Sequence, residues 1–232
     1  RGMPLLLLAA AMGTRAGGAA APPAAAPPAE SCAEGADVVF LHGFGDPPST
    51  QRQFARRLSG ELRESGARLH SPSYHPGGVL TRTRLPAFLE DLEALAKTTS
   101  RGRFSAIIGY SVGSLLAALF QESHPELVDR VVLLAPAIDN FARNFADVPP
   151  DRWFMPSEYV EELRRLSARP AIRVPAVLVH GELDNDDGGS APWRVREWAA
   201  AETFEACFYP RGVGHSAGIV GTDGSPTWSA LV

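Results

Sequence analysis

The most constraining feature of the sequence is residues 107–114, where an apolar run meets the motif Gly-x-Ser-x-Gly. The run from Phe104 to Ile108 predicts a strand, and the helix-forming residues Leu115 to Phe120 predict a helix directly after the motif. The two glycines permit a turn too tight for a Cβ, which places Ser111 between strand and helix. A serine there can attack a carbonyl carbon, with backbone N–H groups holding the resulting oxyanion. The alternative is that Ser111 only caps the helix.

Short apolar runs alternate with amphipathic helical patterns along most of the chain. The expected strands are residues 38–41, 68–74, 104–108, 131–134, 176–179 and 203–209. Three expected helices cover residues 85–97, 115–121 and 157–166. Two more are expected to begin at Ser49 or Thr50 and near Ser190. This alternation predicts an α/β protein with a mostly parallel, doubly wound sheet of about six strands. In such sheets, ligands bind beyond the carboxyl ends of the strands.

The candidate reactive residues each follow a predicted strand, so the sheet should bring them to one edge. His215 is the expected general base, because an imidazole with an ordinary pKa of about 6.5 suits proton transfer at neutral pH. Asp184 is the expected orienting carboxylate, and the backbone amides of Phe44 and Val112 are the expected oxyanion donors. Together with Ser111, they would form a complete catalytic constellation.

Several of these residues also have plainer interpretations. Asp186 and Asp187 share the loop of Asp184 and compete for the orienting role, and the same acidic loop is an alternative site for calcium or another cation. No His or further carboxylate stands at matching spacing, so we expect no metal. His42 and His180 each precede a glycine at a strand end, and we interpret both as structural hydrogen-bonding residues.

Five short motifs together resemble the α/β-hydrolase family. They are His42–Gly45, Gly109–Gly113, Leu133–Pro136, His180–Asp184 and Gly214–Ser216. The order Ser, Asp, His is also that of the family. The resemblance covers about residues 37–216 and is strongest to small serine esterases. It implies a Ser-His-Asp triad and no cofactor. Ser114 departs from the pattern, because many members have a second glycine there, and we expect slightly crowded packing at this position.

The chain divides into an N-terminal tail and one domain. Residues 1–36 are rich in Ala, Pro and Gly and form a low-complexity or targeting tail, whereas residues 37–232 form the α/β-hydrolase domain. By the resemblance, the aromatic-rich residues 137–170 hold the position of a cap insertion. The run Leu5–Ala11 fits a signal peptide, with a transit peptide or a plain tail as alternatives. The compartment therefore stays open, as does whether this chain, which begins at Arg1, is a fragment.

Composition excludes some classes of function. The net charge is −4, and Lys and Arg are scattered, which argues against nucleic-acid binding. No apolar run reaches the roughly 18–20 residues that span a bilayer, so we expect a soluble protein without a transmembrane segment. The two cysteines, Cys32 and Cys207, do not form a disulfide framework.

The sequence thus predicts a serine hydrolase that cleaves a small-molecule carboxylic ester or thioester through an acyl-enzyme. An acyltransferase, in which another alcohol or thiol replaces water, is one alternative. A non-catalytic ligand-binding module of the same fold is another, because fold does not fix function.

Overall fold

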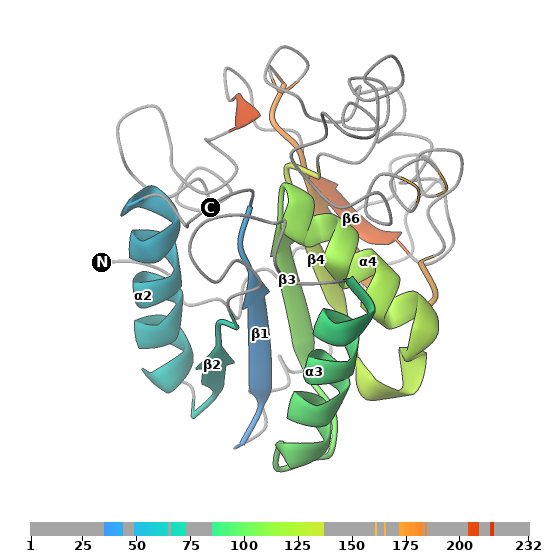
Figure 1. The fold of residues 1–232 in the computed structure, drawn as a ribbon. Helices are drawn as coiled ribbons and strands as arrows, with labels where there is room; N and C mark the ends of the chain where they lie inside the picture. Colours follow the sequence, from blue (N-terminus) through green and yellow to red (C-terminus); the bar gives the residue numbers. More distant parts are fainter. Residues whose placement is uncertain are drawn as a thin grey trace, which may run out of the picture.

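The centre of the molecule is a parallel β-sheet (Figure 1). The computed structural model describes residues 35–43, 49–64, 66–72, 85–136, 161, 165, 172–182, 184, 204–208 and 214–215. Within them, six strands lie in the order β2-β1-β3-β4-β5-β6, and every neighbouring pair is parallel. Their bounds are β1 Asp37–Leu41, β2 Arg68–His70, β3 Ala106–Tyr110, β4 Val131–Leu134, β5 Ala176–Val179 and β6 Phe204–Phe208. This confirms the expected α/β class with a mostly parallel sheet.

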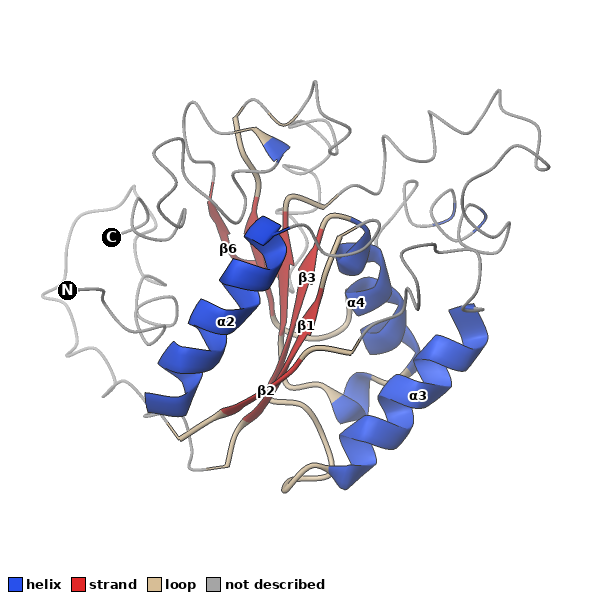
Figure 2. Ribbon diagram, turned by 60° about the vertical axis from the view of Figure 1, so that its left-hand side comes forward, coloured by secondary structure: helices blue, strands red, loops and turns tan. Residues whose placement is uncertain are grey.

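Helices cover both faces of the sheet. Helix α2 (Ser49–Glu64) lies against one face, while α3 (Leu85–Thr98) and α4 (Val112–Ser123) lie against the other (Figure 2). A short 3₁₀ helix, η2 (Pro125–Leu127), follows α4. Of these described helices, none is long and apolar enough to cross a membrane.

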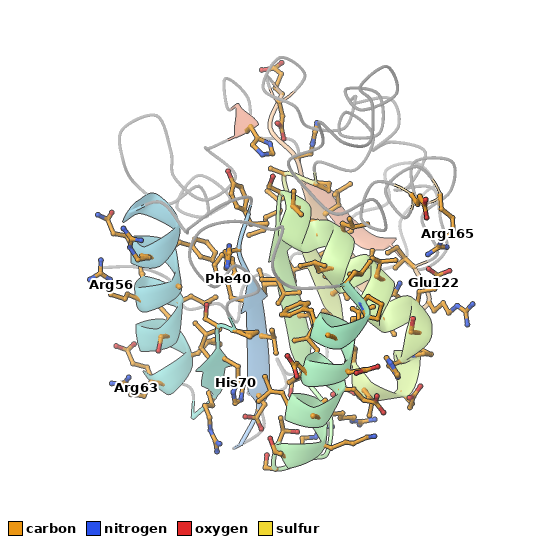
Figure 3. All side chains as sticks on the ribbon, viewed as in Figure 1. Phe40, Arg56, Arg63, His70, Glu122 and Arg165 are labelled. Atoms are coloured by element: carbon orange, nitrogen blue, oxygen red, sulfur yellow. The ribbon has the colours of Figure 1, made fainter. Side chains whose placement is uncertain are left out.

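The apolar side chains of β1 alternate between the two faces of the sheet, and helices pack on them at both faces. Val38 and Phe40 pack into the cluster that includes α2, whereas Val39 and Leu41 pack into the cluster of α3 and α4. Such near-continuous apolar strands are typical of parallel sheets buried on both sides. Figure 3 shows Phe40 on the side of the sheet that faces α2, and its ring centroid lies 5.0 Å from that of Phe54.

The strand before Ser111 extends further than predicted. Gly109 and Tyr110 belong to β3, because Gly109 pairs with Leu41 of β1 and Tyr110 pairs with Leu134 of β4. Phe104 lies before β3 and forms only an isolated bridge to Val128. The apolar run therefore located this strand but placed both of its ends two residues too early.

Some predictions fall outside the described residues. They are the tail before residue 35, the helix near Ser190 and, apart from positions 161 and 165, the 137–170 cap. Arg165 makes two contacts with Glu122 of α4, at 3.0 and 2.5 Å (Figure 3). This bidentate ion pair holds Arg165, one residue of the expected cap segment, beside α4.

Strand order and register bring several strand ends to one place. Strand β1 lies between β2 and β3, so the direction of the chain across the sheet reverses beside β1. Ligand sites in open α/β sheets occur at such reversals. Tyr110, Leu134 and Val179 end their strands in register. The next residues of β3 and β5, Ser111 and His180, therefore emerge at the same edge.

Candidate active site

Ser111 lies on a strained turn between β3 and α4. Its backbone has φ 54° and ψ −118°, a left-handed conformation that is unusual for a residue other than glycine. The flanking glycines make the turn fit. A Cβ on Gly109 would lie 2.5 Å from the carbonyl oxygen of Gly113, and a Cβ on Gly113 would lie 2.1 Å from that of Leu41. The two glycines are thus required by close backbone approach, as the motif predicted.

The hydroxyl of Ser111 points to a histidine and does not cap the helix. Ser111 occupies the N-cap position of α4 but makes no side-chain capping hydrogen bond. Its Oγ lies 2.9 Å from Nε2 of His215, a residue 104 positions later in the chain. This geometry argues against the simple helix-cap interpretation of Ser111.

A second hydrogen bond continues the chain of polar groups from His215 to Asp184. Nδ1 of His215 lies 2.7 Å from Oδ1 of Asp184. With Nδ1–H donating to the carboxylate, Nε2 is left as an acceptor for the hydroxyl proton of Ser111. The structure therefore brings together Ser111, His215 and Asp184, the three side chains predicted to form the triad.

Burial of these groups decreases from the carboxylate to the imidazole. Asp184 is fully buried, Ser111 is 5% exposed, and the His215 side chain is 17% exposed. A buried carboxylate beside a partly open imidazole favours an imidazolium during proton transfer, because the opposite charge is held where water screens it little. The arrangement can support proton transfer from Ser111.

Of the two expected oxyanion donors, Val112 lies among the described residues and Phe44 does not. Val112 begins α4, so its amide belongs to the first turn, whose N–H groups lack intrahelical acceptors. The positive end of the helix dipole lies at the same place. Phe44 is outside the described residues, so its amide stays a prediction.

Ser114 fills the position where a second glycine was expected from the family pattern. Ser114 is fully buried, and its Oγ donates a hydrogen bond to the carbonyl oxygen of Gly109 at 2.9 Å. The same Oγ lies 3.4 Å from the carbonyl oxygen of Leu134. The hydroxyl therefore links the start of α4 to the ends of β3 and β4.

Tyr110, the variable residue between Gly109 and Ser111, also contacts the site, and the sequence analysis did not single it out. Its hydroxyl donates to the carbonyl oxygen of His215 at 3.3 Å, and the two ring centroids lie 5.5 Å apart. The sequence signal was its place one residue before the nucleophile candidate, where a strand end faces the same edge.

The expected structural hydrogen-bonding role of His180 is wrong for the described residues, because neither ring nitrogen has a hydrogen-bond partner there and the side chain lies beside the candidate triad. It is fully buried, and its Nδ1 lies 3.4 Å from Oδ2 of Asp184. Burial lowers the pKa of His180; the Asp184 carboxylate opposes that shift, and His215 adds to it. His180 therefore stays neutral at physiological pH.

The remaining sequence candidates contribute less. His42 is buried and its Nδ1 donates to the carbonyl oxygen of Gly43 at 2.7 Å, in keeping with a structural role. Asp186 and Asp187 lie outside the described residues. Within the part of the chain that the structure describes, no group of three or more His, Cys, Asp or Glu side chains could hold a metal ion.

Comparison with known families agrees with this architecture. A family model described as alpha/beta hydrolase fold matches residues 37–187, more than half of the chain. The chain therefore belongs to the alpha/beta hydrolase fold family. This membership supports hydrolase activity. A serine hydrolase-like protein from Danio rerio is 31% identical over 105 residues. That match covers 44% of this chain and only 31% of the relative, so the chain spans about a third of that protein.

Solved structures share the fold at low sequence identity. A monoacylglycerol lipase from Paleococcus ferrophilus superposes with a TM-score of 0.60 and 16% identity, covering 85% of this chain and 91% of the lipase. A thioesterase domain from the curacin biosynthetic pathway gives a TM-score of 0.52 and 16% identity, covering 80% and 87% of the two chains. At these identities, the similarity establishes the fold and not the substrate.

Proposed function

We propose that this protein is a serine hydrolase that cleaves a carboxylic ester or thioester. The observation that carries the proposal is the hydrogen-bonded series from Ser111 Oγ through His215 to Asp184, with distances of 2.9 and 2.7 Å. Nucleophile, base and orienting group lie within the range that acyl transfer by serine needs. The family assignment supports the hydrolase class, and the names of the similar lipase and thioesterase support these two substrate types.

In the acylation step, Ser111 attacks the substrate carbonyl carbon while Nε2 of His215 takes the hydroxyl proton. The imidazolium formed is stabilised by Asp184, which also holds the ring in the required tautomer. The carbonyl oxygen becomes an oxyanion, for which the amide of Val112 is the proposed donor together with that of Phe44. His215 then gives its proton to the leaving alkoxide or thiolate, and the acyl group stays on Ser111.

In the second step, water replaces the leaving group. His215 takes a proton from the water as it attacks the acyl carbon, and then returns that proton to Ser111 Oγ. The products are a carboxylic acid and the free enzyme. An acyltransferase would use the same groups with an alcohol or thiol in place of water, so the two functions differ only in the acceptor.

The test is labelling of the full chain with a fluorophosphonate probe, followed by intact-mass measurement. An activated serine displaces fluoride from phosphorus and gains a stable phosphonyl group. We expect one adduct on the wild-type chain and none on Ser111→Ala or His215→Ala. Ser123→Ala and His124→Ala are matched controls outside the site and should label like wild type.

The outcome separates the candidate functions. Labelling of the wild type that is lost in both site variants would support the proposal and justify a panel of esters and thioesters. A chain that melts cooperatively but takes up no probe would contradict it and favour a ligand-binding module. Product analysis with added alcohol or thiol would then distinguish hydrolysis from acyl transfer.

A further inference from the structure

One buried titratable residue beside the site has no part in the proposed mechanism. His180 directly follows β5, and none of its side chain is exposed. Among the described residues, neither of its ring nitrogens has a hydrogen-bond partner. Burying a polar group without a partner usually costs free energy, so such a group calls for an explanation.

The same is true of one oxygen of the candidate triad carboxylate. Oδ1 of Asp184 bonds to His215, but Oδ2 is buried and has no hydrogen-bond partner in the described part of the chain. These two unsatisfied groups face each other, because Nδ1 of His180 lies 3.4 Å from Oδ2 of Asp184. At this separation the two atoms make no hydrogen bond in the structure, since one would need a shorter contact or a better-aligned N–H. Hydrogen bonds in catalytic sites are often long or poorly aligned when no substrate is bound.

The charges around His180 are compatible with a neutral donor. Within the described residues, two titratable groups affect the pKa of His180. They are Asp184, four positions later in the chain, and His215, which follows β6. Burial is the largest cause of its lowered pKa, and the ring is therefore neutral. A neutral imidazole carries one N–H, so it can donate from Nδ1 to a carboxylate and keep Nε2 unprotonated.

We propose that His180 is a positioning residue of the site, whose Nδ1–H faces Oδ2 of Asp184 and holds that carboxylate in register with His215. The inference rests on the proposed function, because the carboxylate matters only if it orients a base. With both oxygens engaged, Asp184 cannot rotate away from His215. The N–H dipole also draws part of the negative charge of Asp184 away from the imidazole.

Two variants of His180 separate positioning from simple packing. His180→Asn keeps an N–H donor near the position of Nδ1, whereas His180→Leu fills a similar volume without any donor. The readout is the second-order rate of fluorophosphonate labelling of the full chain, measured from acid to alkaline pH. This rate reports activation of Ser111 and does not require the natural substrate.

We expect His180→Leu to label about tenfold more slowly than wild type, the effect of losing one hydrogen bond to a charged group. The acid limb of its pH profile should move to higher pH. The reason is that Asp184 then acts on His215 with its full charge, so the inactive imidazolium persists to higher pH. His180→Asn should label within about twofold of wild type and keep its acid limb.

A measurement on the unmodified protein makes the test independent of variant folding. In ¹⁵N-histidine NMR of the full chain, His180 should be the Nδ1–H tautomer and should be neutral at pH 6.5, the ordinary pKa of histidine, because burial lowers its own pKa. The signals of His180 are identified by their loss in His180→Asn. If His180→Leu fails to melt cooperatively, the tautomer and the His180→Asn rate carry the test.

Several results would overturn the inference. They are an Nε2–H tautomer, a His180→Leu pH profile identical to that of wild type, and equal losses in the Leu and Asn variants. Failure of the proposed function looks different, because the wild-type chain itself would then take up no probe. In that case an Nδ1–H tautomer would still place the donor opposite Asp184, while the positioning role would be rejected.

Discussion

Nδ1 of His215 and Oδ1 of Asp184 lie 2.7 Å apart, although 31 positions separate the two residues in the sequence. Asp184→Asn keeps the shape of this side chain, but its amide N–H can donate a hydrogen bond to Nδ1. The imidazole would then carry its hydrogen on Nε2 and could not accept the proton of Ser111. We expect the fluorophosphonate labelling rate to fall on the order of 10³–10⁴-fold.

The control for this variant is Asp129→Asn, which removes a partly exposed carboxylate that pairs with Arg101 and Arg103. It should label like wild type. A thermal melt of each variant checks that the fold is retained. If Asp184→Asn folds and labels within tenfold of wild type, the orienting role of Asp184 is wrong, and Asp186 and Asp187 become the next residues to test.

Tyr110 supports His215 from the strand side, so its hydroxyl should affect reactivity without being essential. Tyr110→Phe keeps the ring beside the imidazole but removes the hydrogen bond to the carbonyl oxygen of His215, which is 3.3 Å long. We expect labelling to slow by about two- to tenfold, the range for one neutral hydrogen bond.

Tyr110→Leu, which also removes the aromatic ring, should slow labelling further than Tyr110→Phe does. Both rates are measured against the melting temperature of each variant. An unchanged rate in Tyr110→Phe, with a lowered melting temperature, would mean that the hydroxyl stabilises the fold alone.

Replacing glycine by alanine should have opposite effects on the free energy of unfolding at Gly113, beside Ser111, and at Gly60 in α2. In Gly113→Ala the new Cβ would lie 2.1 Å from the carbonyl oxygen of Leu41 and 2.6 Å from that of His42. Both are backbone atoms and cannot turn aside, so we expect a loss of about 2 kcal/mol or more in the free energy of unfolding.

Gly60→Ala is the matched control. Gly60 is exposed inside α2, and a Cβ there would meet nothing within 4 Å. It should raise the free energy of unfolding by about 0.5–1 kcal/mol, because glycine is a poor helix residue. Urea denaturation measures both variants. Equal effects would show that the close approach at Gly113 does not limit the fold.

The sheet could be predicted because its strands are buried on both sides. Val131–Leu134 and Ala176–Val179 are purely apolar, and the structure has strands with these same bounds. The Gly-x-Ser-x-Gly motif also predicted the turn at Ser111. The predicted strand stopped before Gly109 because glycine is depleted in strands, whereas pairing with β1 and β4 keeps Gly109 and Tyr110 in β3.

The contacts around the candidate triad could be predicted only in part. The order of Ser111, Asp184 and His215 after three strands was visible in the sequence, because parallel strands place their carboxyl ends together. The contacts of Tyr110 and His180 were not, since they depend on how side chains from different strands and loops meet. Nothing in the sequence distinguishes a histidine that faces a carboxylate from one that only packs.

Asp37 forms a polar cluster at the end of β1 opposite the candidate site. It is almost fully buried, and its Oδ1 lies 2.7 Å from Nε2 of His70 (labelled in Figure 3). Its Oδ2 accepts from both the backbone N–H and the hydroxyl of Ser100, each at 3.2 Å. Burial alone would raise the pKa of Asp37, but the hydrogen bonds from His70 and Ser100 and the charge of Arg68 outweigh it and lower the pKa below its ordinary value.

This lowered pKa predicts how stability depends on pH. The folded chain binds the Asp37 proton less tightly than the unfolded chain, so the ionised carboxylate stabilises the fold above the ordinary pKa of 3.8, and this contribution is lost as the pH falls through the lower folded value. In urea denaturation, wild type should exceed Asp37→Asn in free energy of unfolding by a constant amount above about pH 5, and the difference should shrink below about pH 4. Asp91→Asn, an exposed position on α3, controls for the loss of one negative charge. A difference between wild type and Asp37→Asn that is as large at pH about 3 as at neutral pH would mean that packing, and not the ionised carboxylate, accounts for the role of Asp37.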